Sequence, residues 1–369
     1  MSDHLKAPNA AGLLHLRGEA LHKGEPIAPP ITPASMFHLP GDPEPGLAVY
    51  GRNGNPTWEI TEAALGFLED APALLFPSGM AALSAALMAV LKAGDRLLLP
   101  ADGYYVSRRF GETFLARFGV TVEARPTARL GEGGFEGVAA VLIESPSNPG
   151  LDLVDIAAVT AAVRAAGAVS IVDNTTMTPF GQRPLALGAD IVVASDTKAP
   201  GGHSDLLMGH VSSQDEGLMA RVREWRSMSG AIPSAFDAWL LHRSLETLEL
   251  RFERMCDNAE AIAARLATHP KVRALRYPGL ASDPGQALAR AQMRRPGFLI
   301  GLTLESREAA ERFIATCALI TPATSFGGVH TSAERRARWG DDVATGFVRL
   351  AVGTEPLEPL WTAIDAALP

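Results

Sequence analysis

Residues 189–205, ADIVVASDTKAPGGHSD, join a short apolar run to a lysine. The run Ile191–Ala194 is apolar and rich in β-branched residues, which predicts a buried strand that ends close to Lys198. Ser195 and Thr197 supply hydroxyl groups beside the lysine, and the glycines that follow it permit a close backbone approach. A lysine placed in this way suits a Schiff base beside a phosphate group. Because a single lysine after a strand is more often a surface residue, the rest of the chain has to decide between the two interpretations.

Similar apolar runs precede this segment and alternate with alanine-rich stretches that are typical of helices. The runs are residues 73–76, 96–100, 120–126, 138–143 and 169–172. Short runs of Val, Ile and Leu separated by helical stretches indicate βαβ units, in which a crossover helix follows each parallel strand. We therefore expect an α/β fold with a mostly parallel sheet that helices cover on both faces.

The alternation stops near Trp225–Ala235. Residues 233–270 are amphipathic and predict a long helix, which leads into a smaller α+β region with strands within residues 272–279, 298–304 and 347–353. A chain of 369 residues is too long for one compact core. We therefore predict an α/β domain over residues 57–235 and a C-terminal α+β domain over residues 236–369.

Residues 1–56 differ in composition from both predicted domains. They are rich in proline and glycine, as in PIAPPITPASMFHLPGDPEPG (residues 26–46), and show no sustained hydrophobic period. Such a segment cannot form a core of its own. It is either a mobile tail or an arm that packs on another subunit.

The composition excludes several classes of partner. A formal net charge of −8 argues against a nucleic-acid partner, because phosphate binding needs a basic surface. Cys256 and Cys317 have no CxxC spacing, so we expect buried thiols and neither a disulfide nor a metal site. No apolar stretch is long enough to span a membrane, and no basic start with an apolar run marks a targeting segment. We expect a cytoplasmic protein.

Polar residues follow four of the predicted strands, at the carboxyl ends where ligands of parallel α/β sheets bind. Ser78, Gly79 and Met80 follow the strand 73–76 and open a helix, so their hydroxyl and free amide groups suit an anion. An ordinary Ser N-cap explains the same residues equally well. Asn148 lies in ESPSNP, a loop that two prolines stiffen, and could hold its amide over a ligand. An Asn-Pro turn is the simpler explanation.

The third strand end carries Asp173, directly after the apolar run 169–172. A carboxylate in this position needs a hydrogen bond or a charged partner, because an isolated buried carboxylate is costly. The partner is either a structural group or the cationic ring nitrogen of a cofactor. The fourth end is Ser195–Lys198. Together the four ends offer phosphate donors, an acid, an amide and a lysine, which is the set that pyridoxal 5'-phosphate needs.

The chain resembles the Cys/Met-metabolism family of pyridoxal-phosphate enzymes, which includes cystathionine γ-lyase, cystathionine γ-synthase and methionine γ-lyase. The motifs that carry the resemblance run nearly end to end: PIAPPITPASMF, YGRNGNPT, FPSGMAA, ESPSNP, IVDNT, ADIVVASDTKAPGGHSD, WLLHRSLETLELR, YPGL and FVRLAVGTE. The resemblance implies fold type I of these enzymes, the aspartate-aminotransferase-like fold with a seven-stranded-type sheet. It also implies a homotetramer, a dimer of dimers with shared active sites.

The resemblance further implies a role for each matching residue. Lys198 forms the Schiff base with the cofactor and moves protons, and Asp173 pairs with the ring nitrogen. Tyr104 stacks on the ring and assists proton transfer, although a core aromatic residue is the alternative. The residues that would hold the cofactor phosphate are Ser78, Gly79, Met80, Ser195 and Thr197, with Tyr50 and Arg52 reaching it from a neighbouring subunit.

Substrate contacts are implied in the same way. Arg349 matches the arginine that binds the substrate α-carboxylate, a task suited to a bidentate guanidinium. Asn148 lines the cofactor and the incoming amino acid, and the main chain near Ser325 contacts the carboxylate. His330 stands where many relatives carry a glutamate, so it either contacts the distal part of the substrate or is a surface imidazole.

Two further residue pairs differ from the family pattern and bear on the choice of substrate. Tyr105-Val106 replaces the Gly-Gly or Gly-Cys pair that usually follows the stacking tyrosine, and the missing cysteine counts against methionine γ-lyase. Ala199-Pro200 follows Lys198 in place of a bulkier pair.

The resemblance implies an enzyme like cystathionine γ-lyase, which cleaves L-cystathionine by α,γ-elimination to cysteine, 2-oxobutanoate and ammonia. Transferases of the cystathionine γ-synthase and O-acyl-homoserine sulfhydrylase type, and cystathionine β-lyase, stay open because the motifs do not separate them. The complete set of Lys198, Asp173, Tyr104 and Arg349 argues against a non-catalytic descendant of the family. The absence of GxGxxG after an early strand argues against a Rossmann oxidoreductase.

Overall fold

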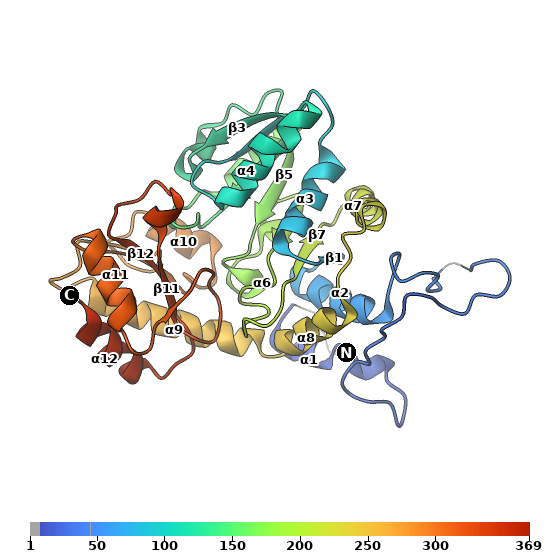
Figure 1. The fold of residues 1–369 in the computed structure, drawn as a ribbon. Helices are drawn as coiled ribbons and strands as arrows, with labels where there is room; N and C mark the ends of the chain where they lie inside the picture. Colours follow the sequence, from blue (N-terminus) through green and yellow to red (C-terminus); the bar gives the residue numbers. More distant parts are fainter. Residues whose placement is uncertain (1–7, 45) are drawn as a thin grey trace.

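A computed structural model describes residues 8–44 and 46–369, and these residues form two sheets connected by helices (Figure 1). The larger sheet has seven strands in the order β1-β7-β6-β5-β4-β2-β3. Its strands are Ala73–Phe76 (β1), Arg96–Pro100 (β2), Thr121–Arg125 (β3), Ala140–Glu144 (β4), Val169–Asp173 (β5), Ile191–Ala194 (β6) and Gly209–Ser212 (β7).

The prediction of a mostly parallel sheet is confirmed, with one exception. Strands β3, β2, β4, β5 and β6 pair in parallel, whereas β7 runs antiparallel to both β1 and β6. The sequence analysis did not identify β7, because its residues GHVS include Gly, His and Ser and do not form an apolar run.

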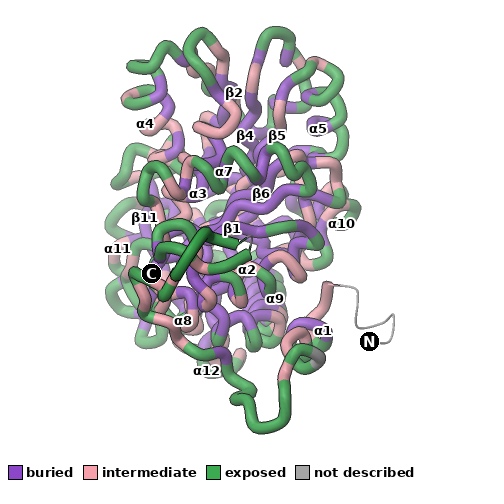
Figure 2. The backbone as a smooth tube through the Cα atoms, turned by 90° about the vertical axis from the view of Figure 1, so that its right-hand side faces the viewer, coloured by how far each residue is buried: buried purple, intermediate pink, exposed green. Residues whose placement is uncertain are grey.

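Helices cover both faces of this sheet, and alternate residues of each central strand point to opposite faces. On one face Leu97, Leu99 and Ile171 pack in a cluster with helix α3 (Gly79–Val90) and helix α7 (Glu216–Ser229). On the other face Leu98 and Val172 pack with helix α5 (Ile156–Ala165). Figure 2 shows the central strands as the buried interior of the molecule. Burial on both faces explains why these strands are continuous apolar runs in the sequence.

The smaller sheet has the order β10-β11-β12-β9-β8 within the described residues. Its strands are Ala274–Arg276 (β8), Leu299–Thr303 (β9), Thr321–Pro322 (β10), Ser332–Arg335 (β11) and Phe347–Ala351 (β12). The neighbouring helices are α10 (Gln286–Gln292), α11 (Arg307–Thr316) and α12 (Leu357–Ala367). The three strands predicted from the sequence correspond to β8, β9 and β12, and the short strands β10 and β11 were not predicted.

The long helix predicted over residues 233–270 is wrong as a single element. It is two helices, α8 (Ala235–Leu245) and α9 (Leu248–Leu266). The carbonyl of Ser244 accepts hydrogen bonds from the Thr247 amide at 3.2 Å and from Arg251 Nη2 at 2.8 Å. This carbonyl therefore does not continue the helical ladder. Helix α9 then runs along the base of the molecule and packs on β9 (Figure 1).

The remaining helices are α1 (Ala10–His15), α2 (Pro56–Glu69), α4 (Tyr105–Thr113) and α6 (Thr178–Gly181). Most of the chain between α1 and α2 has no regular structure and extends from the body of the molecule (Figure 1). Ile27 and Met36 in this segment are largely exposed. The arm at residues 1–56 and the domain boundary near residue 235 stay predictions, and residues 1–7 and 45 of that arm lie outside the described part of the chain.

Two further expectations concern thiols and membranes. Cys256 and Cys317 are free and buried, as predicted from the sequence. No helix within residues 8–44 and 46–369 has the length and apolar character needed to cross a membrane. The cytoplasmic location stays a prediction.

A buried cluster of three ionisable residues lies beneath the strand ends. His210 on β7 contacts Asp196 through Nδ1 at 2.9 Å and Glu69 through Nε2 at 3.3 Å, and all three side chains are buried. Burial alone would lower the pKa of His210, but the charge of Asp196 and the hydrogen bonds to both carboxylates raise it to about 10. The positive charge of His210 therefore holds Asp196, two residues before Lys198, against the end of helix α2.

We expect His210→Gln to lower the free energy of unfolding by about 3–5 kcal/mol at neutral pH, because it leaves two buried carboxylates without a cation. A histidine pKa that is raised by folding stabilises fully below the unfolded value near 6.5 and loses this contribution as the pH rises through 10. Urea unfolding at pH 6 and pH 10 should therefore show a larger difference between wild type and variant at pH 6.

His242 provides the matched control. Its imidazole is also buried, but burial lowers its pKa to about 4, so it is neutral over the whole range. The difference between wild type and His242→Gln should not change between pH 6 and pH 10. If the difference in unfolding free energy between wild type and His210→Gln also stayed the same at pH 6 and pH 10, His210 would not carry the proposed positive charge.

Candidate active site

The carboxyl ends of strands β1, β4, β5 and β6 meet at a cavity of about 450 Å³. Strand ends of a parallel sheet share one edge, so segments far apart in the sequence are brought together there. The residues expected from the sequence that line this cavity are Ser78, Gly79, Met80, Tyr104, Asn148, Asp173, Ser195, Thr197, Lys198, Ser325 and Arg349.

The N-terminus of helix α3 forms one wall of the cavity. Ser78 caps this helix, since its Oγ accepts a hydrogen bond from the Ala81 amide at 3.1 Å. The amides of Gly79 and Met80 donate no hydrogen bond to any described residue. Both sequence interpretations therefore hold together: the hydroxyl caps the helix, and two free amides are left at the positive end of the helix dipole.

Gly79 allows this helix to approach the end of β6. A Cβ atom at this position would lie 2.5 Å from Cβ of Ser195 and 2.9 Å from its Cα. No side chain fits in that space. The free amides of α3 and the hydroxyl of Ser195 consequently lie within one small region, which is the arrangement that a phosphate needs.

Asp173 lies at the end of β5 and faces the cavity. Its Oδ1 accepts hydrogen bonds from the Thr175 amide at 3.0 Å and from Thr175 Oγ1, while Oδ2 accepts none from the described residues. Thr175 Oγ1 in turn accepts from the Ser195 amide at 2.8 Å. Burial raises the pKa of Asp173, and the hydrogen bonds from Thr175 and the charge of Lys198 oppose this rise. Asp173 is thus held in place with one oxygen free to bind a cation.

Lys198 donates a hydrogen bond from Nζ to Ser325 Oγ at 2.8 Å. Ser325 has a φ of 97°, an unusual backbone conformation for a residue other than glycine. Burial and the charge of Arg349 lower the pKa of Lys198 to about 8, although Asp173 and Glu334 act in the opposite direction. About one tenth of the amine is therefore uncharged at neutral pH, far more than for a lysine with the ordinary pKa, and the uncharged amine is the nucleophile and base.

Arg349 connects the small sheet to the cavity from the middle of β12. Its Nη1 donates to Asn148 Oδ1 at 2.6 Å, and its Nη2 donates to the Ser325 carbonyl and to Glu334 Oε2, both at 3.1 Å. Burial lowers the pKa of Arg349 to about 10, so the guanidinium stays charged at neutral pH. A fixed, charged guanidinium in a cavity suits a carboxylate ligand.

Glu144 is a site residue that the sequence analysis did not propose. It ends β4, is buried, and accepts a hydrogen bond from the Tyr104 amide at 2.7 Å. Burial and the charge of Asp173 raise the pKa of Glu144 well above its usual value. The sequence could have identified Glu144 as a site residue, because it follows an apolar run as Asp173 does. Its contact fixes the start of α4, where Tyr104 lines the cavity.

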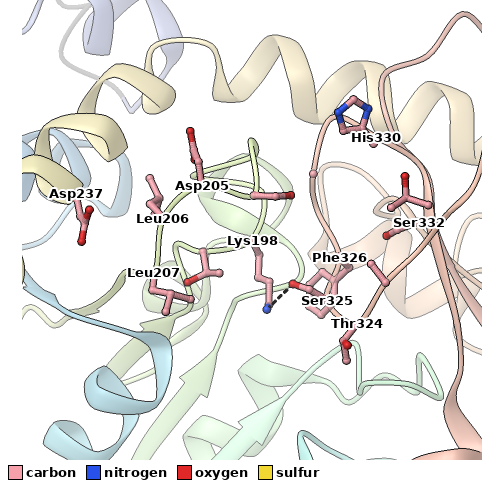
Figure 3. Close-up of a pocket in the computed structure, with 15 residues that line it drawn as sticks. Lys198, Asp205, Leu206, Leu207, Asp237, Thr324, Ser325, Phe326, His330 and Ser332 are labelled. Atoms are coloured by element: carbon pink, nitrogen blue, oxygen red, sulfur yellow. Dashed lines mark hydrogen bonds between the residues drawn. The ribbon is translucent and has the colours of Figure 1, made fainter.

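A second, larger cavity of about 730 Å³ opens beside Lys198. Figure 3 shows His330, Asp205 and Asp237 around it, with the hydrogen bond from Lys198 to Ser325 at its inner end. His330 lines this cavity and not the smaller one. Whether His330 contacts the substrate stays a prediction.

Tyr50 and Arg52 do not line either cavity within a single chain. Arg52 Nη1 donates to the Ser227 carbonyl at 2.6 Å, and its guanidinium lies 5.6 Å from the centre of the Tyr50 ring. Tyr50 is 45% exposed. The expectation that both residues act on a neighbouring subunit stays a prediction.

The smaller cavity fits pyridoxal phosphate on these observations. The cofactor has a phosphate, an aldehyde and a basic ring nitrogen. The cavity offers free helix amides with the Ser195 hydroxyl, a lysine with a lowered pKa, and a carboxylate with one unpaired oxygen. Each group of the cofactor therefore has a complementary group on this chain.

Comparison with known proteins gives three findings. A family model described as Cys/Met metabolism PLP-dependent enzyme matches residues 13–369. A Streptomyces coelicolor protein named "Putative cystathionine gamma-lyase" is 48% identical over 354 residues, which cover 94% of this chain and 90% of the relative. Cystathionine beta-lyase of Lactococcus lactis subsp. cremoris is 35% identical, covering 93% of this chain and 94% of the relative.

A solved structure is also closely similar. The crystal structure of cystathionine gamma synthase from Xanthomonas oryzae pv. oryzae in complex with cystathionine aligns with a TM-score of 0.92 at 33% identity. The alignment covers 97% of each chain. The three names state three different reactions of related substrates.

The lowered pKa of Lys198 predicts how the protein takes up its cofactor. The rate at which cofactor-free protein gains visible absorbance from added pyridoxal phosphate should rise with pH and level off above about 8, because the uncharged amine attacks the aldehyde. Arg349→Met removes a neighbouring positive charge, so the midpoint should move to higher pH. Lys198→Ala should show no such absorbance. A wild-type midpoint near the ordinary lysine value of 10.5 would contradict this prediction.

Proposed function

Because the chain belongs to the Cys/Met-metabolism family of pyridoxal-phosphate-dependent enzymes, we propose that it is a lyase that cleaves L-cystathionine by α,γ-elimination. With one water consumed, the products are cysteine, 2-oxobutanoate and ammonia. The observation that carries the proposal is Lys198, with a pKa near 8, in one cavity with Asp173 and the charged Arg349. The 48% identity to the Streptomyces coelicolor protein supports the γ-lyase reaction among the alternatives.

The cofactor would be held by residues of all four strand ends. When bound, pyridoxal phosphate supplies an electron sink for the negative charge that develops at the substrate Cα. Asp173 would bind the ring nitrogen through its free oxygen, and Tyr104 and Asn148 would contact the ring. The phosphate would be held by Ser78, Gly79, Met80, Ser195 and Thr197.

Lys198 Nζ is the proposed base for the proton on Cα and, in γ-elimination, for the proton on Cβ. Its lowered pKa leaves about one tenth of the amine uncharged at neutral pH, far more than for an ordinary lysine, and Ser325 Oγ accepts a hydrogen bond from it. Burial raises the pKa of Tyr104, so the phenol keeps its proton. A protonated phenol that lines the cavity suits proton donation to the leaving sulfur.

Arg349 would bind the substrate α-carboxylate. Hydrogen bonds to Asn148, Ser325 and Glu334 orient the guanidinium. Such preorganisation fixes the amino acid so that its Cα proton faces the base.

A transferase is the second candidate. The similarity to cystathionine gamma synthase over 97% of each chain supports a reaction that joins an O-acyl-homoserine to a thiol. The Lactococcus relative supports cystathionine β-lyase in the same way. Each of these reactions consumes or forms a small sulfur amino acid.

The products identify the reaction. Purified enzyme with L-cystathionine should release 2-oxobutanoate, and a release of pyruvate would instead indicate β-elimination. Thioether formation from O-succinyl- or O-acetyl-homoserine with cysteine would indicate a transferase. Lys198→Ala should abolish turnover while the protein stays folded, because Lys198 is the proposed base. Full activity in this variant would overturn the assignment.

We also propose the homotetramer with shared active sites. In support, Tyr50 and Arg52 do not line the cavities of their own chain, and Phe236 on α8 and Leu250 on α9 are exposed apolar side chains. In this arrangement the segment that carries Tyr50 and Arg52 completes the phosphate site of a neighbouring subunit.

Complementation tests the sharing directly. Arg52→Ala and Lys198→Ala should each be inactive or nearly so. Subunits mixed by unfolding and refolding should regain about one quarter of the wild-type activity, since half of the dimers are mixed and one site in each is intact. Sites built from a single chain would give no recovery.

A further inference from the structure

The cavity that contains Lys198 and Arg349 is lined by a second buried arginine. Arg336 begins the short helix η6 (Arg336–Trp339), directly after β11. It is 4% exposed, so it is not a solvated surface charge. Its charge partly offsets the rise in the pKa of Tyr104, which indicates that it lies near the proposed proton donor. The roles proposed above leave Arg336 unassigned.

Arg336 has hydrogen-bond donors to spare. Its Nε donates to Asp341 Oδ2 at 2.8 Å and its Nη1 donates to Glu334 Oε2 at 2.9 Å, while Nη2 lies 2.7 Å from the same Asp341 oxygen. A guanidinium has five N–H groups, of which these contacts engage three. One N–H on each Nη atom has no partner within residues 8–44 and 46–369. A carboxylate that enters the cavity can accept both.

Arg336 and Arg349 are held by the same carboxylate. Glu334 Oε2 accepts from Arg336 Nη1 at 2.9 Å and from Arg349 Nη2 at 3.1 Å. Burial would raise the pKa of Glu334, but hydrogen bonds from Trp339, Arg338 and Arg336 outweigh this and lower it. Glu334 therefore stays ionised and sets the spacing of the two guanidinium groups.

The larger cavity is less suited to an anionic group than the smaller one. Lys198 lines both cavities, but the larger one is lined by Asp205 and Asp237 and by no arginine, and its acidic groups repel a carboxylate. A ligand with an acidic group at each end would be favoured with both acids in the smaller cavity, where the two arginines lie.

We propose that Arg336 binds a second carboxylate of the substrate, so that the site selects amino acids with an acidic group at the end distant from the reacting carbon. The inference rests on the proposed function, since L-cystathionine carries a carboxylate at each end. Arg349 takes the α-carboxylate next to the reacting carbon, and Arg336 takes the distal one. Methionine and O-acetyl-homoserine have no distal carboxylate, whereas O-succinyl-homoserine has one.

The test compares Arg336→Gln with wild type on these four substrates. We expect KM for L-cystathionine and O-succinyl-homoserine to rise about 10- to 100-fold, the loss of a hydrogen-bonded charge contact, with kcat little changed. KM for O-acetyl-homoserine and methionine should change less than threefold, roughly, because they make no contact with Arg336. A loss that is equal on all four substrates, or no loss on any, would overturn the proposal.

Arg338→Gln is the matched control. Arg338 also donates to Glu334, at 2.8 Å, but its side chain is 40% exposed and does not line the cavity. This variant removes one partner of Glu334 and should leave the preference among the four substrates as in wild type. Arg336→Lys keeps the charge and the fold but not the planar donor pair, and should show the same selective rise in KM to a smaller degree.

The design separates this inference from the proposed reaction. If wild type does not cleave L-cystathionine, the γ-lyase proposal fails, and the two O-acyl-homoserines still compare an acidic with a neutral distal group. For a substrate that binds without turnover, titration of the cofactor's visible spectrum gives its dissociation constant. A selective weakening of the acidic ligands by Arg336→Gln supports the proposal in either case, and its absence contradicts it.

Discussion

The cost of burying ionised groups governs the construction of this site. Lys198 and Arg349 carry like charges into one cavity, and removal from water is unfavourable for each. Asp173 and Glu334 partly offset this cost, because their negative charges favour the ammonium form of Lys198. Burial of the lysine, together with the remaining repulsion from Arg349, lowers the pKa of Lys198 and favours the free amine. The two carboxylates thus stabilise the buried positive charges only in part, and this partial stabilisation leaves Lys198 reactive.

Two hydrogen bonds between residues of this site connect the small sheet to the large one. Asn148 follows β4 of the large sheet and accepts a hydrogen bond from Arg349 on β12, and Ser325, near the small sheet, accepts one from Lys198. Both contacts join residues that line the smaller cavity. The site is therefore not a hollow within one sheet but the place where two sheets are joined through polar groups. A change in either contact alters the shape of the cavity together with its charge.

Prediction from the sequence was most accurate where burial is complete. Strands β1 and β2 agree residue for residue with the apolar runs, because both faces are covered. Strand β7 was missed, since His210 and the flanking Gly and Ser serve an ionic cluster and a close approach to α3 instead of an apolar pattern. At the break between α8 and α9 the Ser244 carbonyl accepts from the Arg251 side chain, a contact that hydrophobic periodicity does not reveal.

Residues of the candidate site were likewise easiest to predict where they directly follow an apolar strand. Lys198, Asp173 and the α3 N-terminus follow strands and were found by that position. Glu334 and Arg336 lie in a short strand and a helical turn of the small sheet, within the charged run ERRAR. From the sequence this run is either a solvent-exposed helix face or a group of charges that attracts an acidic substrate tail. Only the folded chain shows that these charges point inward. The role proposed for Tyr50 and Arg52 requires a neighbouring subunit, which the structure of one chain does not contain.

The two buried cysteines have a consequence for an enzyme that handles sulfur compounds. Burial raises the pKa of Cys256 to about 12 and also raises that of Cys317, so both stay as thiols at physiological pH. Thiolates, not thiols, attack disulfides. The two thiols of this chain therefore exchange poorly with the disulfides of small sulfur amino acids, and the chain resists cross-linking under conditions in which exposed cysteines would form mixed disulfides.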